Sequence, residues 1–176
     1  MSFDSRQFRD ALGHFATGIA VVTTATEEGQ VAGVTVNSFT SVSLDPPLLL
    51  ISLARSIASL ALFERSRHFA VSLLREDQRH VSAAFASSGQ SKWQGARHHP
   101  GTIVPCPIIH PNLAAFECET YARYDGGDHR LLLGRVVRME TPEAAQPRRP
   151  LLYFRGQYRE LSEDNIDIAP FRLEGW

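Results

Sequence analysis

Short runs of β-branched and apolar residues, each ended by turn residues, recur along the whole chain and constrain its fold most strongly. Residues 31–43 alternate apolar and polar side chains, residues 18–24 are rich in β-branched side chains, and 48–53 are nearly all apolar. Further segments of this kind are 68–74, 113–124, 130–140, 151–154 and 157–161. These strands do not alternate strictly with helices, which argues against a parallel sheet built from βαβ units. The pattern predicts a mainly antiparallel β-barrel with attached helices.

Three segments have the apolar spacing of amphipathic helices, and each begins with residues suited to a helix start. Asp4 and Ser56 can cap the first and the second, and the acids Glu76 and Asp77 suit the positive end of the third. The apolar faces consist of Phe8, Ala11, Leu12 and Phe15, of Ile57, Leu60, Ala61 and Phe63, and of Val81, Ala84 and Phe85. Side chains spaced in this way share one helix face, so we expect three short helices.

Turn residues divide the strands into hairpins. Asp45-Pro46-Pro47 ends the strand candidate before it, and Asp125-Gly126-Gly127-Asp128 predicts a hairpin between the two longest strands. Arg155-Gly156 predicts a last, short hairpin. Residues 87–110 hold many Gly and Pro residues and are the least regular part, and 141–150 are expected to form a loop. A loop as long as the first of these is usually functional or mobile.

Length and charge limit the classes of protein that this chain can represent. Its 176 residues fit one domain over 1–176, and 43% apolar with 21% charged residues is an ordinary globular composition. The 18 basic and 19 acidic side chains give a net charge of −1, which argues against nucleic-acid and membrane partners. The longest apolar run, 48–54, is far shorter than the ~20 residues of a membrane span.

The cysteines and histidines suggest a reducing compartment and no metal site. Two cysteines are too few for a secreted disulfide framework, and the charged N-terminal residues do not form a signal peptide, so we expect a cytoplasmic protein. Cys106 and His110 are four residues apart, with His98 and His99 upstream. That segment is broken by prolines and lacks the paired spacings of zinc sites, so we expect no metal. Cys118, in the middle of a strand, is expected to be a buried thiol.

Small hydroxyl and amide side chains concentrate on one strand and at the end of the next. Over 33–48, Thr, Asn and Ser side chains can hydrogen-bond a planar heterocycle. At 52–56, hydroxyls, a guanidinium and a helix start come together, which is a plausible phosphate cradle. From these residues alone, a solvated sheet face and a simple helix cap are the more common explanations of the pattern. The motifs of the common nucleophilic enzymes and phosphate loops are absent.

An ordered set of motifs resembles the flavin reductase-like family, the short-chain NAD(P)H:flavin oxidoreductases that serve two-component monooxygenases. The matching segments are 15–24, 35–39, 41–47, 52–56, 69–74, 77–78, 85–86, 127–129 and 151–158. The Ser-Leu-Asp-Pro-Pro turn and the Gly-Asp-His turn make the set specific. The resemblance covers about 8–161 and leaves 162–176 as a C-terminal tail.

The resemblance implies an antiparallel split β-barrel of the FMN-binding type, a homodimer with flavin near the subunit interface, and a set of site residues. Those implied to bind the cofactor, FMN or FAD, are Thr35, Val36, Asn37, Ser38, Ser52, Leu53, Ala54, Arg55, Ser56, Phe85, Ala86 and Lys92. Arg55 and Lys92 are expected near phosphate. His129 is implied to position the nicotinamide of NADH or NADPH, with Tyr153 and Gly156 beside it.

The implied activity is hydride transfer from nicotinamide to flavin, with reduced flavin passed to a partner flavin-dependent oxygenase. The cofactor carries this chemistry, so the protein's task is to hold two rings at reacting distance. Two alternatives share the same barrel: a non-catalytic flavin-binding protein, and an oxidase of the pyridoxamine-phosphate-oxidase type. A fold by itself does not separate these functions.

Overall fold

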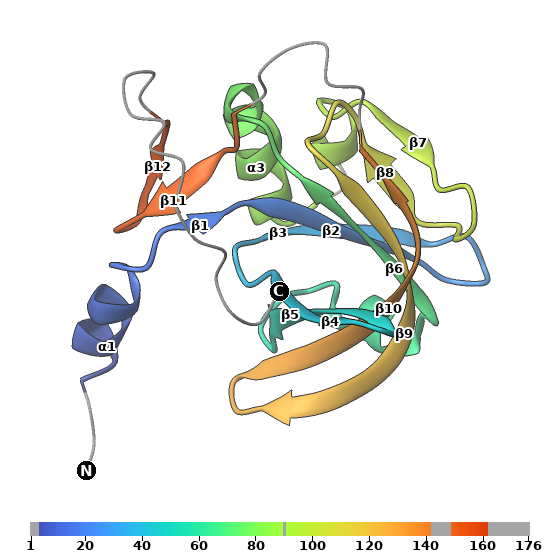
Figure 1. The fold of residues 1–176 in the computed structure, drawn as a ribbon, viewed down its shortest axis with the longest axis horizontal. Helices are drawn as coiled ribbons and strands as arrows, with labels where there is room; N and C mark the ends of the chain where they lie inside the picture. Colours follow the sequence, from blue (N-terminus) through green and yellow to red (C-terminus); the bar gives the residue numbers. More distant parts are fainter. Residues whose placement is uncertain (1–3, 90, 142–148, 162–176) are drawn as a thin grey trace.

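The computed structural model of the chain describes residues 4–89, 91–141 and 149–161 (Figure 1). The helices are α1 (Ser5–Leu12), α2 (Leu60–Arg65) and α3 (Arg79–Ala86), with short 3-10 helices η1 (Glu76–Gln78) and η2 (Ser91–Trp93). The strands are β1 (Thr17–Gly18), β2 (Ala20–Ala25), β3 (Val31–Val36), β4 (Thr40–Leu44), β5 (Pro47–Ala54), β6 (His68–Leu73), β7 (His98–Pro100), β8 (Pro107–Ile109), β9 (Ala115–Gly126), β10 (His129–Glu140), β11 (Leu152–Phe154) and β12 (Gln157–Arg159). Most of the predicted loop at 141–150 and the tail at 162–176 lie outside the described residues.

Seven strands form one antiparallel sheet in the order β3-β2-β6-β9-β10-β5-β4. The sheet curves around a common interior, with β3 at one edge and β4 at the other (Figure 1). Within the described residues these edges do not pair, so the barrel stays open. Just after β3, the Ser38 hydroxyl donates to the carbonyl of Ser52 on β5 at 2.9 Å and accepts from its amide at 3.0 Å. The prediction of a mainly antiparallel barrel with attached helices is confirmed.

One predicted strand is wrong in its extent. The single strand expected over 31–43 is two strands, β3 and β4, and they belong to opposite edges of the sheet. The chain leaves β3 after Val36 and crosses through Asn37–Phe39, and β4 then forms a hairpin with β5. The alternation of side chains continues across the break, so the sequence pattern alone does not reveal it.

The three predicted helices form, but two of them differ from expectation. Asp4 caps α1 by accepting from the amide of Arg6 at 2.9 Å, yet the apolar face of α1 is exposed, with Phe15 just beyond it at 78% exposure. Ser56 does not cap the second helix, because α2 begins at Leu60 after a turn. Figure 1 shows α1 standing apart from the main sheet. None of the described helices is long and apolar enough to cross a membrane.

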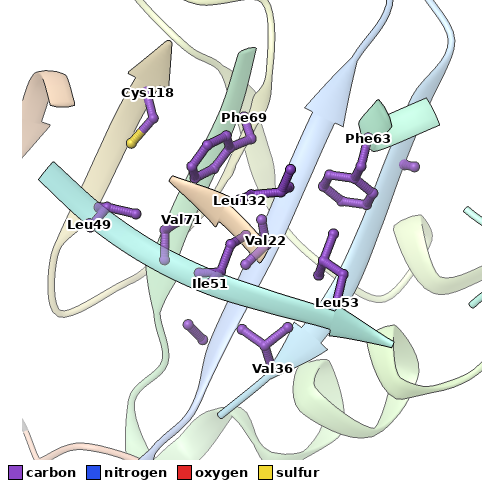
Figure 2. Packing of buried hydrophobic residues seen from close by; sticks show 12 residues of the cluster. Val22, Val36, Leu49, Ile51, Leu53, Phe63, Phe69, Val71, Cys118 and Leu132 are labelled. Carbon is purple, nitrogen blue, oxygen red and sulfur yellow. The ribbon is translucent and has the colours of Figure 1, made fainter. Parts of the chain in front are cut away.

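The main core fills the inside of the curved sheet. Alternate residues of β5 point inward into this core. Figure 2 shows Ile51 among them, in one cluster with Leu132 of β10 and the rings of Phe63 and Phe69. A second core lies on the other face of β2, where Val21 and Phe85 of α3 are buried. Gly33 on β3 makes this packing possible, because a Cβ there would lie 2.5 Å from the ring of Phe85. Helix α3 therefore lies directly against β3.

The segment predicted to be irregular, 87–110, contains η2, β7 and β8, and a buried acid fixes the connection between β7 and β8. Glu117 on β9 is 4% exposed and accepts hydrogen bonds from the amides of Thr102, Ile103 and Val104 at 3.0, 2.6 and 2.8 Å. Burial alone raises the pKa of Glu117, but these three donors and Arg138 at 3.3 Å outweigh it and lower the pKa. No local pattern in the sequence marks this anchor.

Candidate active site

Three cavities follow one another along β3 and share lining residues. The first, about 590 Å³, is named here the Lys92 cavity, and the second, about 220 Å³, the Thr35 cavity; Ala86 lines both. The third, about 790 Å³, is named the α1 cavity, and it shares Asn37 and Tyr153 with the Thr35 cavity. The six residues of β3 alone span roughly 20 Å, so the row suits an elongated ligand.

The Lys92 cavity combines one cation with several hydroxyl groups. It is lined by four residues predicted to bind the cofactor: Ser56, Phe85, Ala86 and Lys92. The Lys92 ammonium donates to the carbonyl of Gly33 at 3.1 Å and lies 5.7 Å from the centre of the Phe85 ring. Burial lowers the pKa of Lys92. An ammonium has three donors and one is used by Gly33, so two remain for an anion such as phosphate.

The Thr35 and α1 cavities are lined by the polar end of β3 and by the last hairpin. Thr35, Val36 and Asn37 line the Thr35 cavity, and Ser38 and Gly156 line the α1 cavity. The Thr35 and Ser38 hydroxyls already bond backbone carbonyls, of Ser82 at 2.7 Å and of Ser52 at 2.9 Å. These two hydroxyls therefore hold the lining of the cavities in place. The groups that remain to hydrogen-bond a bound ring are the backbone and Asn37.

Of the predicted residues at 52–56, only Ser56 lines one of these three cavities. Leu53 is 1% exposed and its side chain lies in the core, so that side chain is not available to a ligand. Ala54 pairs with His129 on β10, and Ser52 pairs with Leu131. Arg55, expected near phosphate, instead donates from Nε to the carbonyl of Gly127 at 3.0 Å and forms an ion pair with Asp125. Its role toward phosphate stays a prediction.

His129 stands where the β9–β10 hairpin begins its second strand. Its Nδ1 lies 2.7 Å from Oδ1 of Asp128, and this hydrogen bond, together with the nearby His129 charge, lowers the pKa of Asp128. The register pairs His129 with Ala54, so the hairpin and the end of β5 form one unit. Asp128 belongs to the Gly-Asp-His turn, yet it was not among the predicted site residues.

Other residues around the cavities were also missed. Ser82 on α3 and Tyr158 on β12 line the Thr35 cavity, and their hydroxyl oxygens are 3.0 Å apart. Tyr158 belongs to a matched motif, which was the available signal, whereas Ser82 reaches the cavity only through the packing of α3 on β3. The described residues hold no cluster of three His, Cys, Asp or Glu side chains able to bind a metal. Cys106 and Cys118 are buried free thiols, and burial raises the pKa of Cys106 to about 12.

Residues 12–162 match the family described as the flavin reductase like domain. The chain belongs to the flavin reductase-like family. Two relatives illustrate its neighbours within this family. The FMN reductase (NADH) SmoA of Agrobacterium fabrum is 45% identical over 139 residues, covering 77% of this chain and 76% of the relative. The NADH-dependent flavin reductase StyB of Pseudomonas fluorescens is 42% identical over 160 residues, covering 90% of this chain and 91% of the relative.

Solved structures of flavin reductase-like proteins share the fold over almost the whole chain. The nitrilotriacetate monooxygenase component B homologue from Mycobacterium thermoresistibile superimposes with a TM-score of 0.89 at 37% identity, covering 97% of this chain and 94% of that one. This chain spans only 51% of one longer relative, the reductase component of a trigonelline monooxygenase of Acinetobacter baylyi. The predicted family and the split-barrel fold are confirmed. The relatives' names agree with the predicted NAD(P)H:flavin oxidoreductase class and with its flavin and nicotinamide cofactors.

Proposed function

We propose that this protein transfers hydride from NADH to a flavin and releases the reduced flavin to a partner oxygenase. The row of cavities along β3, in a chain of this family, is the observation that carries the proposal. Relatives named as NADH-dependent reductases favour NADH over NADPH, and SmoA favours FMN. Relatives named as reductase components of monooxygenases support the oxygenase partner. The two buried free cysteines suit a reducing, cytoplasmic compartment.

In this proposal each part of the site holds a different portion of the two substrates. Lys92 and Ser56 bind the flavin phosphate, while Asn37 and the backbone around Ser38 bind the isoalloxazine ring. His129 orients the nicotinamide from the neighbouring hairpin, with its Nδ1 fixed by Asp128. The flavin supplies the hydride acceptor when bound. The protein contributes mainly alignment of two rings, which accounts for a large part of such a rate enhancement.

A steady-state comparison of substrates tests the function. We expect rapid loss of NADH absorbance with FMN, FAD or riboflavin added, slower loss with NADPH, and the lowest KM for FMN. Tight flavin binding without NADH oxidation would instead identify a non-catalytic flavin-binding protein. Oxidation of pyridoxamine phosphate, with oxygen as acceptor and no nicotinamide, would identify the oxidase alternative.

Lys92→Met should weaken FMN binding by roughly tenfold to a hundredfold, because a charged hydrogen bond is worth ~1.5–3 kcal/mol. Methionine keeps the length of the side chain and its packing over Phe85. Riboflavin carries no phosphate, so its affinity should hardly change. Fluorescence titration of both flavins measures the two dissociation constants. An equal loss for FMN and riboflavin would remove Lys92 from the phosphate site.

We also propose that the protein is a homodimer through the outer face of β4, β5 and β10. Leu49 of β5 points into the core, so Leu50 points to the opposite face, where it pairs with Leu133 of β10. Val42 and Leu44 on the neighbouring edge strand β4 are also exposed. Apolar side chains gathered on a sheet surface in this way commonly mark an interface. A second copy of the chain would cover it.

Leu133→Glu should convert the dimer into a monomer, because a charge on an apolar interface is desolvated without a partner. Ile103→Glu is the matched control, since Ile103 is an exposed apolar side chain, at 62% exposure, away from this face. Sedimentation velocity should show a dimer for the wild type and for Ile103→Glu. A wild-type monomer that binds flavin tightly would refute the dimer.

A further inference from the structure

We infer that Arg55 is a positioning residue that holds the β9–β10 hairpin, and with it His129, against the end of β5. The inference rests on the proposed function, in which His129 orients the nicotinamide. It gives Arg55 a role different from phosphate binding, and it makes Asp125 part of the same unit. The end of β5 and the hairpin then move together.

All the polar contacts that the structure shows for Arg55 go to this hairpin. Its backbone amide donates to the carbonyl of Asp128 at 2.9 Å, and its Nε donates to the carbonyl of Gly127 at 3.0 Å. Its Nη2 forms the ion pair with Asp125. A guanidinium presents its donors in a rigid fork, so bonds to two different hairpin residues fix both position and direction.

The partners of Arg55 lie beside His129 in sequence and in space. Gly127 and Asp128 form the turn, and His129 begins β10 directly after it. Asp128 bonds His129 on one side through its carboxylate and Arg55 on the other through its carbonyl. Arg130, the next residue, also reaches Asp125, at 3.3 Å. A shift of the turn would therefore displace the imidazole.

The geometry does not favour phosphate binding by Arg55. The Lys92, Thr35 and α1 cavities are lined without Arg55, whereas Lys92 extends into the first of them. The Asp125 carboxylate already balances the guanidinium charge. The Arg55 side chain is 43% exposed and that of Asp125 is 75% exposed, and such a pair contributes little to global stability. Its effect should therefore appear in alignment rather than in melting temperature.

The test compares Arg55→Ala with the milder Asp125→Asn, which preserves the shape of the hairpin. For Arg55→Ala we expect kcat/KM for NADH to fall roughly tenfold to a hundredfold, since a misplacement of about 1 Å can cost that much. KM for NADH should rise and kcat should fall, while the Kd of FMN and of riboflavin stays unchanged. Asp125→Asn should shift the same parameters less. The double variant should lose less than the sum of the two single variants, because both remove the Arg55–Asp125 pair, although Asp125→Asn also removes the contact with Arg130.

Two further variants make the comparison specific. Arg55→Lys keeps the charge but not the fork, so it should not restore the NADH parameters. Arg79→Ala removes a similarly exposed ion pair, Arg79 with Glu160 at 2.6 Å, and should leave NADH kinetics unchanged.

Each contrary result has a distinct meaning. A weaker affinity for FMN but not for riboflavin in Arg55→Ala would restore the phosphate role and overturn the inference. Normal NADH kinetics in that variant would overturn it as well. A wild type that does not oxidise NADH would overturn the proposed function itself, whereas an active wild type leaves the comparison of variants decisive.

Discussion

Glu117→Gln should lower the free energy of unfolding by about 3 kcal/mol, because it breaks a buried, fully hydrogen-bonded ionic anchor. Three backbone amides and Arg138 point at the carboxylate, and glutamine offers only one acceptor oxygen to them. The NH₂ group of the glutamine side chain is itself a donor and would face these N–H donors. Urea denaturation followed by tryptophan fluorescence gives the difference between variant and wild type.

The control for this variant lies two residues along the same strand. Glu119 is 44% exposed in its ion pair with Arg135, so Glu119→Gln should leave the unfolding midpoint nearly unchanged. If both variants lost stability equally, the loss would reflect β9 in general and not the buried anchor. If neither lost stability, Glu117 would not fix the loop.

The contribution of Glu117 should also depend on pH in a defined direction. Its pKa is lowered in the folded chain, so its stabilisation is complete above the unfolded value of about 4.3. It is lost as pH falls through the lowered folded pKa. The stability difference between wild type and Glu117→Gln should therefore stay constant near neutral pH and shrink in acid.

His129→Ala should lower kcat/KM for NADH about a hundredfold while leaving flavin affinity nearly unchanged. Its imidazole is tied to Asp128 and sits on the hairpin beside β5, not in the cavities along β3. Both KM and kcat should change, because positioning in the transition state is lost together with ground-state binding. Steady-state kinetics and flavin titration on the same preparation separate these effects.

Two substitutions refine the assignment of His129. Glutamine places an amide near the position of Nε2, and asparagine places one near that of Nδ1, which faces Asp128. We expect His129→Gln to retain more activity than His129→Asn if the outer nitrogen meets the nicotinamide. A lower melting temperature with normal kinetics in the surviving fraction would instead make His129 a turn residue only.

Much of the fold follows from local sequence signals. The β9–β10 and β11–β12 hairpins lie where turn residues predicted them, and Gly156, with φ of 75°, occupies the left-handed conformation that its turn needs. The break between β3 and β4 was missed, because it depends on which edge each half joins. Ser56 was misassigned as a helix cap, because a turn follows it and the N-cap position of α2 is Ser59.

The site could be predicted only in part, for the same reason. Residues in consecutive positions, such as Thr35 to Ser38, were placed by motif and do line the cavities. Contacts across distant segments were not foreseen, such as Arg55 with Asp125, or Glu117 with the amides of the 102–104 loop. Such pairs form when the hairpin folds against β5 and the loop against β9, and no local pattern records them.

The central claim is most directly tested by mixing NADH with excess FMN and a catalytic amount of the protein under anaerobic conditions. Without oxygen, reduced flavin accumulates, and its absorbance reports hydride transfer without any partner oxygenase. We predict loss of the oxidised-flavin absorbance in step with NADH, one flavin reduced for each NADH consumed, over many turnovers. Retention of the oxidised-flavin absorbance, with FMN bound and NADH unconsumed, would contradict the account.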